Sequence, residues 1–332
     1  MGSETVQRDY TWDSLKFVLI VFVILGHWLE YGLDVFPNRV VFNYIYLFHM
    51  PLFIFISGCF SKKKENDSFV KDILHLTETY IIVQILYVLT SYLFQHKPFS
   101  WLQLYMPNAA AWYLLSLISW KIILQVLPDG WTEKQFMLPF LLIISLLAGF
   151  IPVENELSLQ RTLAFMPFFF LGYLLKQKIQ FGTTSLSQKL LSVIVLLSVL
   201  VVSFFLLNRD ISFITWCKFD YYKPSYSALV LLFMRALYLT IATVLLYCVL
   251  KVFPRVLQPN LMSRLGSDTL FYYVYHIIVM RLGIIIIRHF HLPMVFPAML
   301  LYTLISIFIL FLMGKLKPLR WLLNPISSLK NN

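Results

Sequence analysis

Four ionisable residues near the start of the chain have the types and spacing needed for acid–base chemistry. Lys16 and His27 are eleven residues apart, almost three whole helical turns, so a helix would place both on one face, about 16 Å apart along its axis. Asp13 and Glu30 fall near the same stripe, and Glu30 is close enough to pair with His27. Such a histidine could take a proton from a hydroxyl near neutral pH while the carboxylate orients it. The alternative is that Lys16 only snorkels and His27 only bonds to a neighbouring helix.

Two further histidines lie within apolar runs. His49 comes just before Pro51, which should kink its helix because proline removes a backbone hydrogen bond. The kink could open a cavity, but we expect His49 to form a structural bond between helices. His276 shares a helical face with Tyr272, and we expect a packed histidine bonded to that tyrosine.

Two arginines also lie within apolar runs, where a charge at mid-membrane costs about 2.5–3.5 kcal/mol. Arg235 and Arg281 stay charged, so we expect both to face the protein interior. There they could pair with Glu30 or Glu78, or hold an anionic ligand.

Several catalytic signatures are absent from the sequence, among them the GxSxG elbow, HExxH, the phosphate-binding glycine loop and the dinucleotide fingerprint. The three cysteines are far apart and predict neither a disulfide framework nor a zinc site. His289 and His291 lack a third ligand, so no metal is predicted. We interpret Ser57 and Gly58 as a close-packing site rather than a nucleophile.

The composition places these residues in a membrane protein. Apolar residues make up 59% of the 332 positions and charged residues 13%, against about 25% charged in soluble domains. The net charge of +11 does not indicate nucleic acid, because the basic residues lie in short clusters between apolar runs. The sequence predicts one all-α domain, 1–332, a polytopic transmembrane helix bundle in contact with membrane lipid. The ten expected spans lie near 15–35, 40–60, 73–94, 109–127, 136–151, 161–175, 190–207, 228–250, 269–287 and 295–314.

The basic clusters predict that both termini face the cytosol. Sixteen basic residues then lie on the inner side: Arg8, Lys62, Lys63, Lys64, Lys71, Lys134, Lys176, Lys178, Lys189, Lys251, Arg255, Arg264, Lys315, Lys317, Arg320 and Lys330. Seven lie on the outer side: Arg39, Lys97, Arg161, Arg209, Lys218, Lys223 and Arg288. We expect the aromatic residues of the outer loop, 208–227, to form an interfacial belt; the alternative is a platform on which sugar rings stack.

An ordered set of segments resembles the membrane acyltransferase 3 family, and in particular its fucose 4-O-acetylase-like branch. The set covers nearly the whole chain: 13–16 (DSLK), 25–27 (LGH), 48–53 (FHMPLF), 56–58 (ISG), 112–115 (WYLL), 161–173 (RTLAFMPFFFLGY) and 265–276. The family commonly has arginine where this chain has Lys16, and an Arg-x-x-Arg pair found in relatives is not present at 71–75.

The resemblance implies a ten-helix O-acyltransferase in a bacterial plasma (inner) membrane. It would move an acyl group, usually acetyl, from cytosolic acyl-CoA to a sugar hydroxyl of an envelope or exported glycan, with a carbohydrate or glycolipid acceptor and glycan-assembly proteins as partners. His27 would be the general base, oriented by Glu30, and an acyl-histidine intermediate stays open. Candidate contacts to the CoA phosphates are Lys16, Lys62, Lys63, Lys64, Lys71 and Arg264. Candidates for a substrate or structural cavity are Asp13, His49, Trp112, Arg161, Arg235, Tyr272, His276 and Arg281.

Two other classes of protein remain alternatives. A glycan or lipid transporter would use the same intramembrane charges as a substrate path, but transporters often contain inverted repeats and the sequence shows none. A non-catalytic membrane partner of a glycan-assembly complex would predict that His27 is dispensable.

Overall fold

The computed structural model describes residues 9–96, 98–100, 105–131, 135–153, 155–206, 211–222 and 226–323. Every regular element in these ranges is a helix, which confirms the predicted all-α bundle. The α-helices are α1 (Thr11–Leu29), α2 (Phe36–Tyr46), α3 (His49–Cys59), α4 (Asn66–Gln95), α6 (Trp112–Val126), α7 (Met137–Leu147), α8 (Leu159–Leu175), α9 (Leu186–Leu206), α10 (Ser212–Thr215), α11 (Ala228–Val252), α12 (Leu261–Ser267), α13 (Thr269–His289), α14 (Phe296–Met313) and α15 (Lys317–Leu323). Short 3₁₀ turns are η1 (Glu30–Gly32), η2 (Ala109–Ala111), η3 (Ala148–Phe150), η4 (Glu156–Ser158) and η5 (Lys176–Lys178).

Within the described residues, eight helical segments are long and apolar enough to cross a bilayer. They are Thr11–Gly32, Phe36–Cys59, Asn66–Gln95, Ala109–Val126, Leu186–Phe205, Ala228–Val252, Thr269–His289 and Phe296–Met313. Two shorter segments, Met137–Phe150 and α8, occupy the fifth and sixth predicted ranges. Each of the ten predicted ranges therefore contains helix; position 207 lies outside the described residues.

Contacts between helix ends give the molecule two sides. On the first side, which we call the basic end because Lys16 and Lys62–64 lie there, the N–H of Tyr10 donates to the carbonyl of Val256 at 3.0 Å. Lys63 also pairs there with Asp129, 2.7 Å away. All four of these partners come from segments that the sequence assigns to the inner side.

On the opposite side, the side-chain amide of Asn38 donates to the carbonyl of Met294 at 2.7 Å, and the N–H of Tyr221 donates to the carbonyl of Gly149, also at 2.7 Å. These segments are the ones assigned to the outer side, so the chain alternates between two ends as predicted. Which end faces the cytosol stays a prediction. Six of the basic residues on which this orientation prediction rests lie outside the described part of the chain: Arg8, Lys97, Lys134, Arg209, Lys223 and Lys330.

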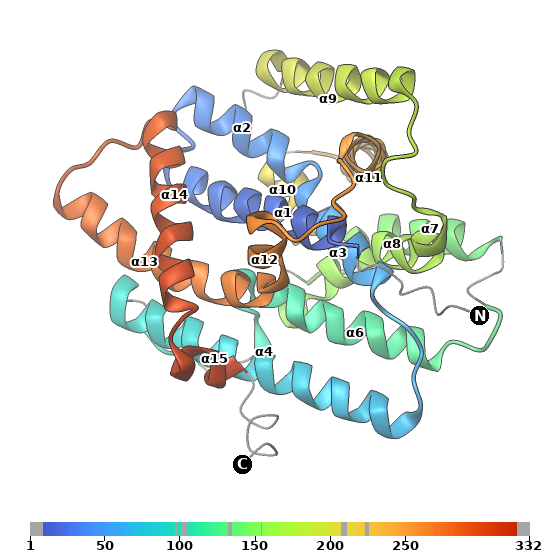
Figure 1. Cartoon of the computed structure of the whole chain (residues 1–332), viewed down its shortest axis with the longest axis horizontal. Coiled ribbons are helices and arrows are strands. Elements are labelled where there is room, and N and C mark those ends of the chain that lie inside the picture. The colour runs from blue at the N-terminus through green and yellow to red at the C-terminus, as the bar shows by residue number, and fades with distance from the viewer. Residues whose placement is uncertain are drawn as a thin grey trace.

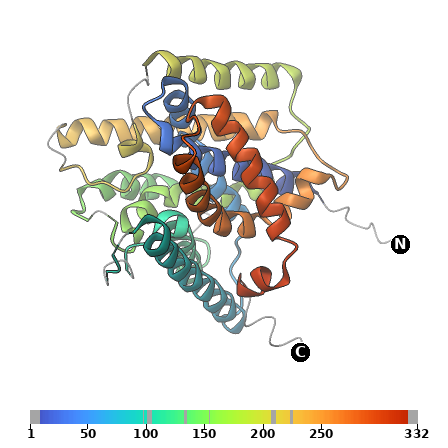
Figure 2. The same ribbon diagram turned by 90° about the vertical axis from the view of Figure 1, so that its left-hand side faces the viewer.

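The helices differ in how far the rest of the protein covers them. In Figure 1 and Figure 2, α9 runs along the upper edge and α4 along the lower edge, with α1 between them. In the most apolar 18 residues of Phe36–Cys59, 78% of the residues are buried; in those of Leu186–Phe205 only 11% are, and that segment exposes Leu and Phe side chains. Such a continuous apolar surface suits contact with lipid.

The second predicted span is broken rather than merely kinked. The chain leaves helical geometry at Phe48 (φ −138°), which separates α2 from α3. Pro51 explains the position, because its ring lacks an N–H and would clash with the carbonyl of Leu47, four residues earlier. The break turns the last residues of α2 and the first of α3 toward the interior.

The crossing of α3 and α8 confirms the interpretation of 57–58 as a packing site. A Cβ atom on Gly58 would lie 1.9 Å from the carbonyl oxygen of Phe169, and one on Gly172 would lie 1.9 Å from that of Phe55. The hydroxyl of Ser57 donates to the carbonyl of Phe53, within its own helix. Only glycine allows the two backbones to approach this closely.

Candidate active site

His27 and Glu30 form the predicted pair at the end of α1. Nδ1 of His27 lies 3.1 Å from Oε2 of Glu30, and the hydroxyl of Tyr46 donates to Oε1 of Glu30 at 3.0 Å. Because a carboxylate only accepts hydrogen bonds, Nδ1 carries the ring proton and the lone pair is on Nε2. Glu30 thus fixes the tautomer that a general base needs.

A cavity of about 310 Å³ lies beside this pair, at the end of the bundle opposite the basic end. Its wall is formed by the end of α1, the α2–α3 break, the starts of α6 and α8, the segment 211–222 and α13. Six predicted site residues line it: His27, Glu30, His49, Trp112, Arg161 and Arg281. Lining residues that the sequence analysis did not single out for the site include Tyr31, Tyr46, Gln95, Asn155, Lys218 and Tyr273.

His276 packs against the predicted base. The centroids of its ring and the His27 ring are 5.2 Å apart. Nδ1 of His276 donates to the carbonyl of Tyr273 at 2.6 Å, and its Nε2 has no partner among the described residues. The histidine is packed and bonded to a tyrosine, but through the backbone: the carbonyl of Tyr273 is its partner at 2.6 Å, and the backbone of Tyr272 adds a further contact.

His49 lies in the cavity wall, and its hydrogen bond joins two helices, α3 and α2, that both come from one predicted span. Its Nδ1 donates to the carbonyl of Ile45 at 2.8 Å. That carbonyl lies in the last turn of α2, where the break at Phe48 removes helical partners. The break therefore both opens the cavity wall and orients His49 in it.

Two arginines reach the cavity from different helices, Arg281 from α13 and Arg161 from α8. Arg281 donates to the carbonyl of Tyr87, to the hydroxyl of Thr90 at 2.6 Å and to the side-chain carbonyl of Asn108 at 2.9 Å. Arg161, in the first turn of α8, lies over the Trp112 ring with its guanidinium carbon 4.9 Å from the centroid. Neither arginine forms an ion pair with a carboxylate of the described residues.

Arg235 is buried like Arg281, so both arginines face the interior as predicted, but Arg235 lies outside the cavity. It donates to the carbonyl of Phe219 at 3.2 Å and sits over the Tyr221 ring, 4.7 Å from the centroid. The suggested pairing of either arginine with Glu30 or Glu78 was wrong, because neutral oxygens and aromatic rings surround them instead. Tyr272 and Asp13 also lie outside the cavity lining.

The six predicted CoA contacts lie near the basic end and do not line the cavity. Lys16 pairs with Asp13 at 2.7 Å, Lys63 with Asp129 and Lys64 with Asp72. Three residues are exposed without an ion pair in the described part of the chain: Lys62, Lys71 and Arg264.

The basic end also contains a feature that the sequence analysis missed. The ring of Phe60 is flanked by two ammonium groups, that of Lys16 at 5.7 Å and that of Lys176 at 5.0 Å from the centroid. Lys176 follows α8, far from Lys16 in sequence, so only the fold brings the two cations to one ring.

The loop after α9 contributes more than an interfacial belt. Trp216 lines the cavity, and the ammonium group of Lys218 lies 4.5 Å from the centroid of its ring. The run of aromatic residues in this loop was the sequence pattern that could have indicated a ligand site, but we interpreted it as an interfacial belt. Placement in the cavity wall favours the alternative, a platform for a ring-shaped ligand.

Comparisons with known proteins show to which family the chain belongs. A family model described as an acyltransferase domain, Acyl_transf_3, matches residues 9–314. Short segments are similar to nodulation protein NolL, 48% identical over 61 residues in Mesorhizobium japonicum and 47% over 55 residues in Sinorhizobium fredii. These segments cover 17% and 15% of this chain, and 16% and 15% of the two relatives. No solved structure matches the chain. Because the family model spans nearly the whole chain, this multi-pass membrane protein belongs to the Acyl_transf_3 acyltransferase family.

Proposed function

We propose that the chain transfers an acyl group, acetyl in the first instance, from acyl-CoA to a sugar hydroxyl of an envelope or exported glycan. The observation that carries this proposal is the His27–Glu30 pair on the wall of a cavity sized for a small ligand. Family membership supports acyl transfer. The CoA donor, the glycan acceptor, a bacterial plasma membrane and the fucose 4-O-acetylase-like branch are all part of the proposal.

His27 would act on the acceptor hydroxyl. Its Nε2 takes the hydroxyl proton as the oxygen attacks the thioester carbonyl, so a C–O bond forms and the C–S bond breaks. The CoA thiolate leaves and receives the proton from Nε2, which restores the neutral imidazole. Glu30 holds Nδ1–H throughout and stabilises the positive charge that develops on the ring.

The donor would bind at the basic end. Lys16 and Lys176 would contact phosphates, while Phe60 between them offers a face on which a planar base can stack. Lys62, Lys71 and Arg264 are exposed and would add to the attraction of the anionic donor.

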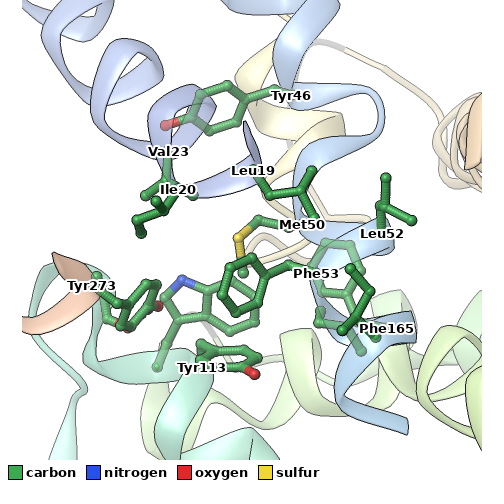
Figure 3. Packing of buried hydrophobic residues seen from close by; sticks show 14 of the residues in the cluster. Leu19, Ile20, Val23, Tyr46, Met50, Leu52, Phe53, Tyr113, Phe165 and Tyr273 are labelled. Atoms are coloured by element: carbon green, nitrogen blue, oxygen red, sulfur yellow. Dashed lines mark hydrogen bonds between the residues drawn. The ribbon is translucent and has the colours of Figure 1, made fainter. Parts of the chain in front are cut away.

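The route from the basic end to His27 is filled by packed side chains. Ile20 and Val23 of α1 belong to one packed hydrophobic cluster with Phe53 of α3 (Figure 3), and all three are less than a tenth exposed. The thioester could reach His27 only if these side chains moved aside. The proposal therefore includes a rearrangement of this cluster when the donor binds.

Mass analysis of envelope glycans with and without the gene tests the proposal. Loss of one acyl group per repeat, with chain length and export unchanged, is the expected result. A transporter would instead change export, and an assembly partner would change chain length, so either result in place of deacylation would overturn acyl transfer as the function.

A further inference from the structure

Two arginines line the cavity beside the His27–Glu30 pair. They are Arg161 and Arg281, and Glu30 is the carboxylate among the described lining residues. Glu30 is already engaged by His27 and Tyr46. The charges of Arg161 and Arg281 are therefore not neutralised by an ion pair with a carboxylate of the described residues.

Arg161 is the least satisfied of these cations. Its guanidinium has a ring contact with Trp112 but no hydrogen bond or ion pair within the described residues, and its Nε is buried without a partner. It lies in the first turn of α8, where the helix dipole adds further positive potential. A partly buried cation of this kind is costly unless an anion compensates it.

Arg281 is held in place, but its charge is not neutralised. Its three described hydrogen bonds go to two oxygens of α4 and to Asn108, which fix the guanidinium plane. A guanidinium fixed in this way is preorganised for a carboxylate or phosphate.

Aromatic rings accompany the cations. Trp112 lies beneath Arg161, and Trp216 beneath Lys218, and both rings line the cavity. Indole faces suit the apolar faces of a sugar ring. A volume of about 310 Å³ is at the lower end for ligand sites, which fits one sugar residue with a charged substituent.

We infer that the acceptor is an acidic sugar residue, with a carboxylate or phosphate held by Arg161 and Arg281 and its reacting hydroxyl at His27. This inference rests on the proposed function and specifies its acceptor class. An anionic group would neutralise the two arginines, and Glu30 stays with His27.

Two measurements on the purified full-length chain in nanodiscs test the inference. Calorimetric binding compares methyl glucoside, methyl glucuronide and glucose 6-phosphate, which share a ring and differ in charge. Acetyl transfer from acetyl-CoA to the same three compounds is monitored through the release of the CoA thiol and through the mass of the product. We expect at least one acidic sugar to bind about tenfold more tightly than the neutral one, since charge-assisted hydrogen bonds are the stronger kind. Comparing methyl glucuronide with glucose 6-phosphate shows whether the site prefers a carboxylate or a phosphate.

Arg161→Gln and Arg281→Gln should each weaken binding of the preferred acidic sugar about tenfold, leave the neutral sugar unchanged and leave the KM for acetyl-CoA unchanged. Arg161→Lys should restore part of the loss. Arg288→Gln is the matched control, because Arg288 is exposed near the end of the same helix as Arg281 and does not line the cavity.

The outcomes separate this inference from the proposed function. Equal or absent binding of charged and neutral sugars overturns the acidic acceptor, and so does a rise in the acetyl-CoA KM in the arginine variants, which would place the donor phosphates here. Tighter binding of the charged sugars supports an acidic ligand even if none of the three compounds is acetylated. If no glycan is acetylated in a His27-dependent way, that result counts against acyl transfer alone and not against the acidic ligand.

Discussion

At the scale of single residues, Glu30 decides how His27 can act. The carboxylate accepts from Nδ1 and from the Tyr46 hydroxyl, which leaves Nε2 as the basic nitrogen of a side chain on the cavity wall. The one-turn spacing made this pair predictable. The neighbouring His276 and Tyr46 were not predictable as partners, because their positions depend on how α13 and α2 pack against α1.

Glu30→Gln tests the orienting role. The amide can still bond to the imidazole, but it loses the charge and can donate to Nδ1, which would favour the wrong tautomer. We expect kcat to fall about tenfold or more, with an unchanged KM for acetyl-CoA. Steady-state kinetics checks this, and Glu65→Gln, at an exposed position near the basic end, is the control. An unchanged kcat would show that Glu30 does not orient the base.

Lys16 separates donor binding from chemistry. If it holds a CoA phosphate, Lys16→Arg should keep most of the affinity, Lys16→Ala should weaken it and Lys16→Glu should weaken it further through repulsion. Added salt should weaken the wild type in the same direction. Acyl-CoA affinity is measured on purified, folded variants. Equal affinity for lysine, alanine and glutamate would mean that Lys16 only anchors α1.

At the scale of helices, the break between α2 and α3 and the close crossing of α3 with α8 shape the cavity. Pro51 made an irregularity predictable from sequence, but not that it would be a full break or that the helix partner of His49 would be α2. The sequence also could not predict that Gly58 packs against the helix of Gly172, because Gly172 lies more than a hundred residues further along the chain.

Gly172→Val tests the crossing. Because even a Cβ atom would lie 1.9 Å from the carbonyl oxygen of Phe55, the backbones must separate, and we expect a loss of stability of at least about 1–3 kcal/mol. The thermal midpoint and the yield of monodisperse protein should both fall. Gly314→Ala is the matched control, since its nearest contacts would be 3.4 Å away, in ordinary van der Waals range. Equal stability of the two variants would mean that the crossing is looser than described.

At the scale of the whole molecule, the chain separates a basic end from a cavity end. The apolar runs predicted the helices because a bilayer leaves the backbone few alternatives, and the alternation of basic clusters predicted which segments meet. The cavity wall was only partly predictable. Trp216, Lys218 and Asn155 come from connecting segments, whose positions are set by the surrounding helices rather than by periodicity.

The orientation of the two ends can be tested with reporter fusions. A fusion after Lys64 should report the cytosolic side and one after Tyr222 the opposite side, because basic clusters are retained in the cytosol. The cavity, with Trp216 in its wall, would then open toward the outer side, where an exported glycan is found. Reports from the same side would refute the alternating arrangement of spans.

The central claim, that His27 is the general base for acyl transfer, is tested most directly by His27→Ala. The variant should insert, fold and bind acetyl-CoA like the wild type, because the expected phosphate contacts lie at the other end of the bundle. Transfer of radiolabelled acetyl to the isolated envelope glycan should fall by about 10²–10⁴-fold. As controls, the thermal midpoint shows whether the variant is folded, and calorimetry shows whether it binds acetyl-CoA. Near-normal acylation by folded His27→Ala protein would contradict the account.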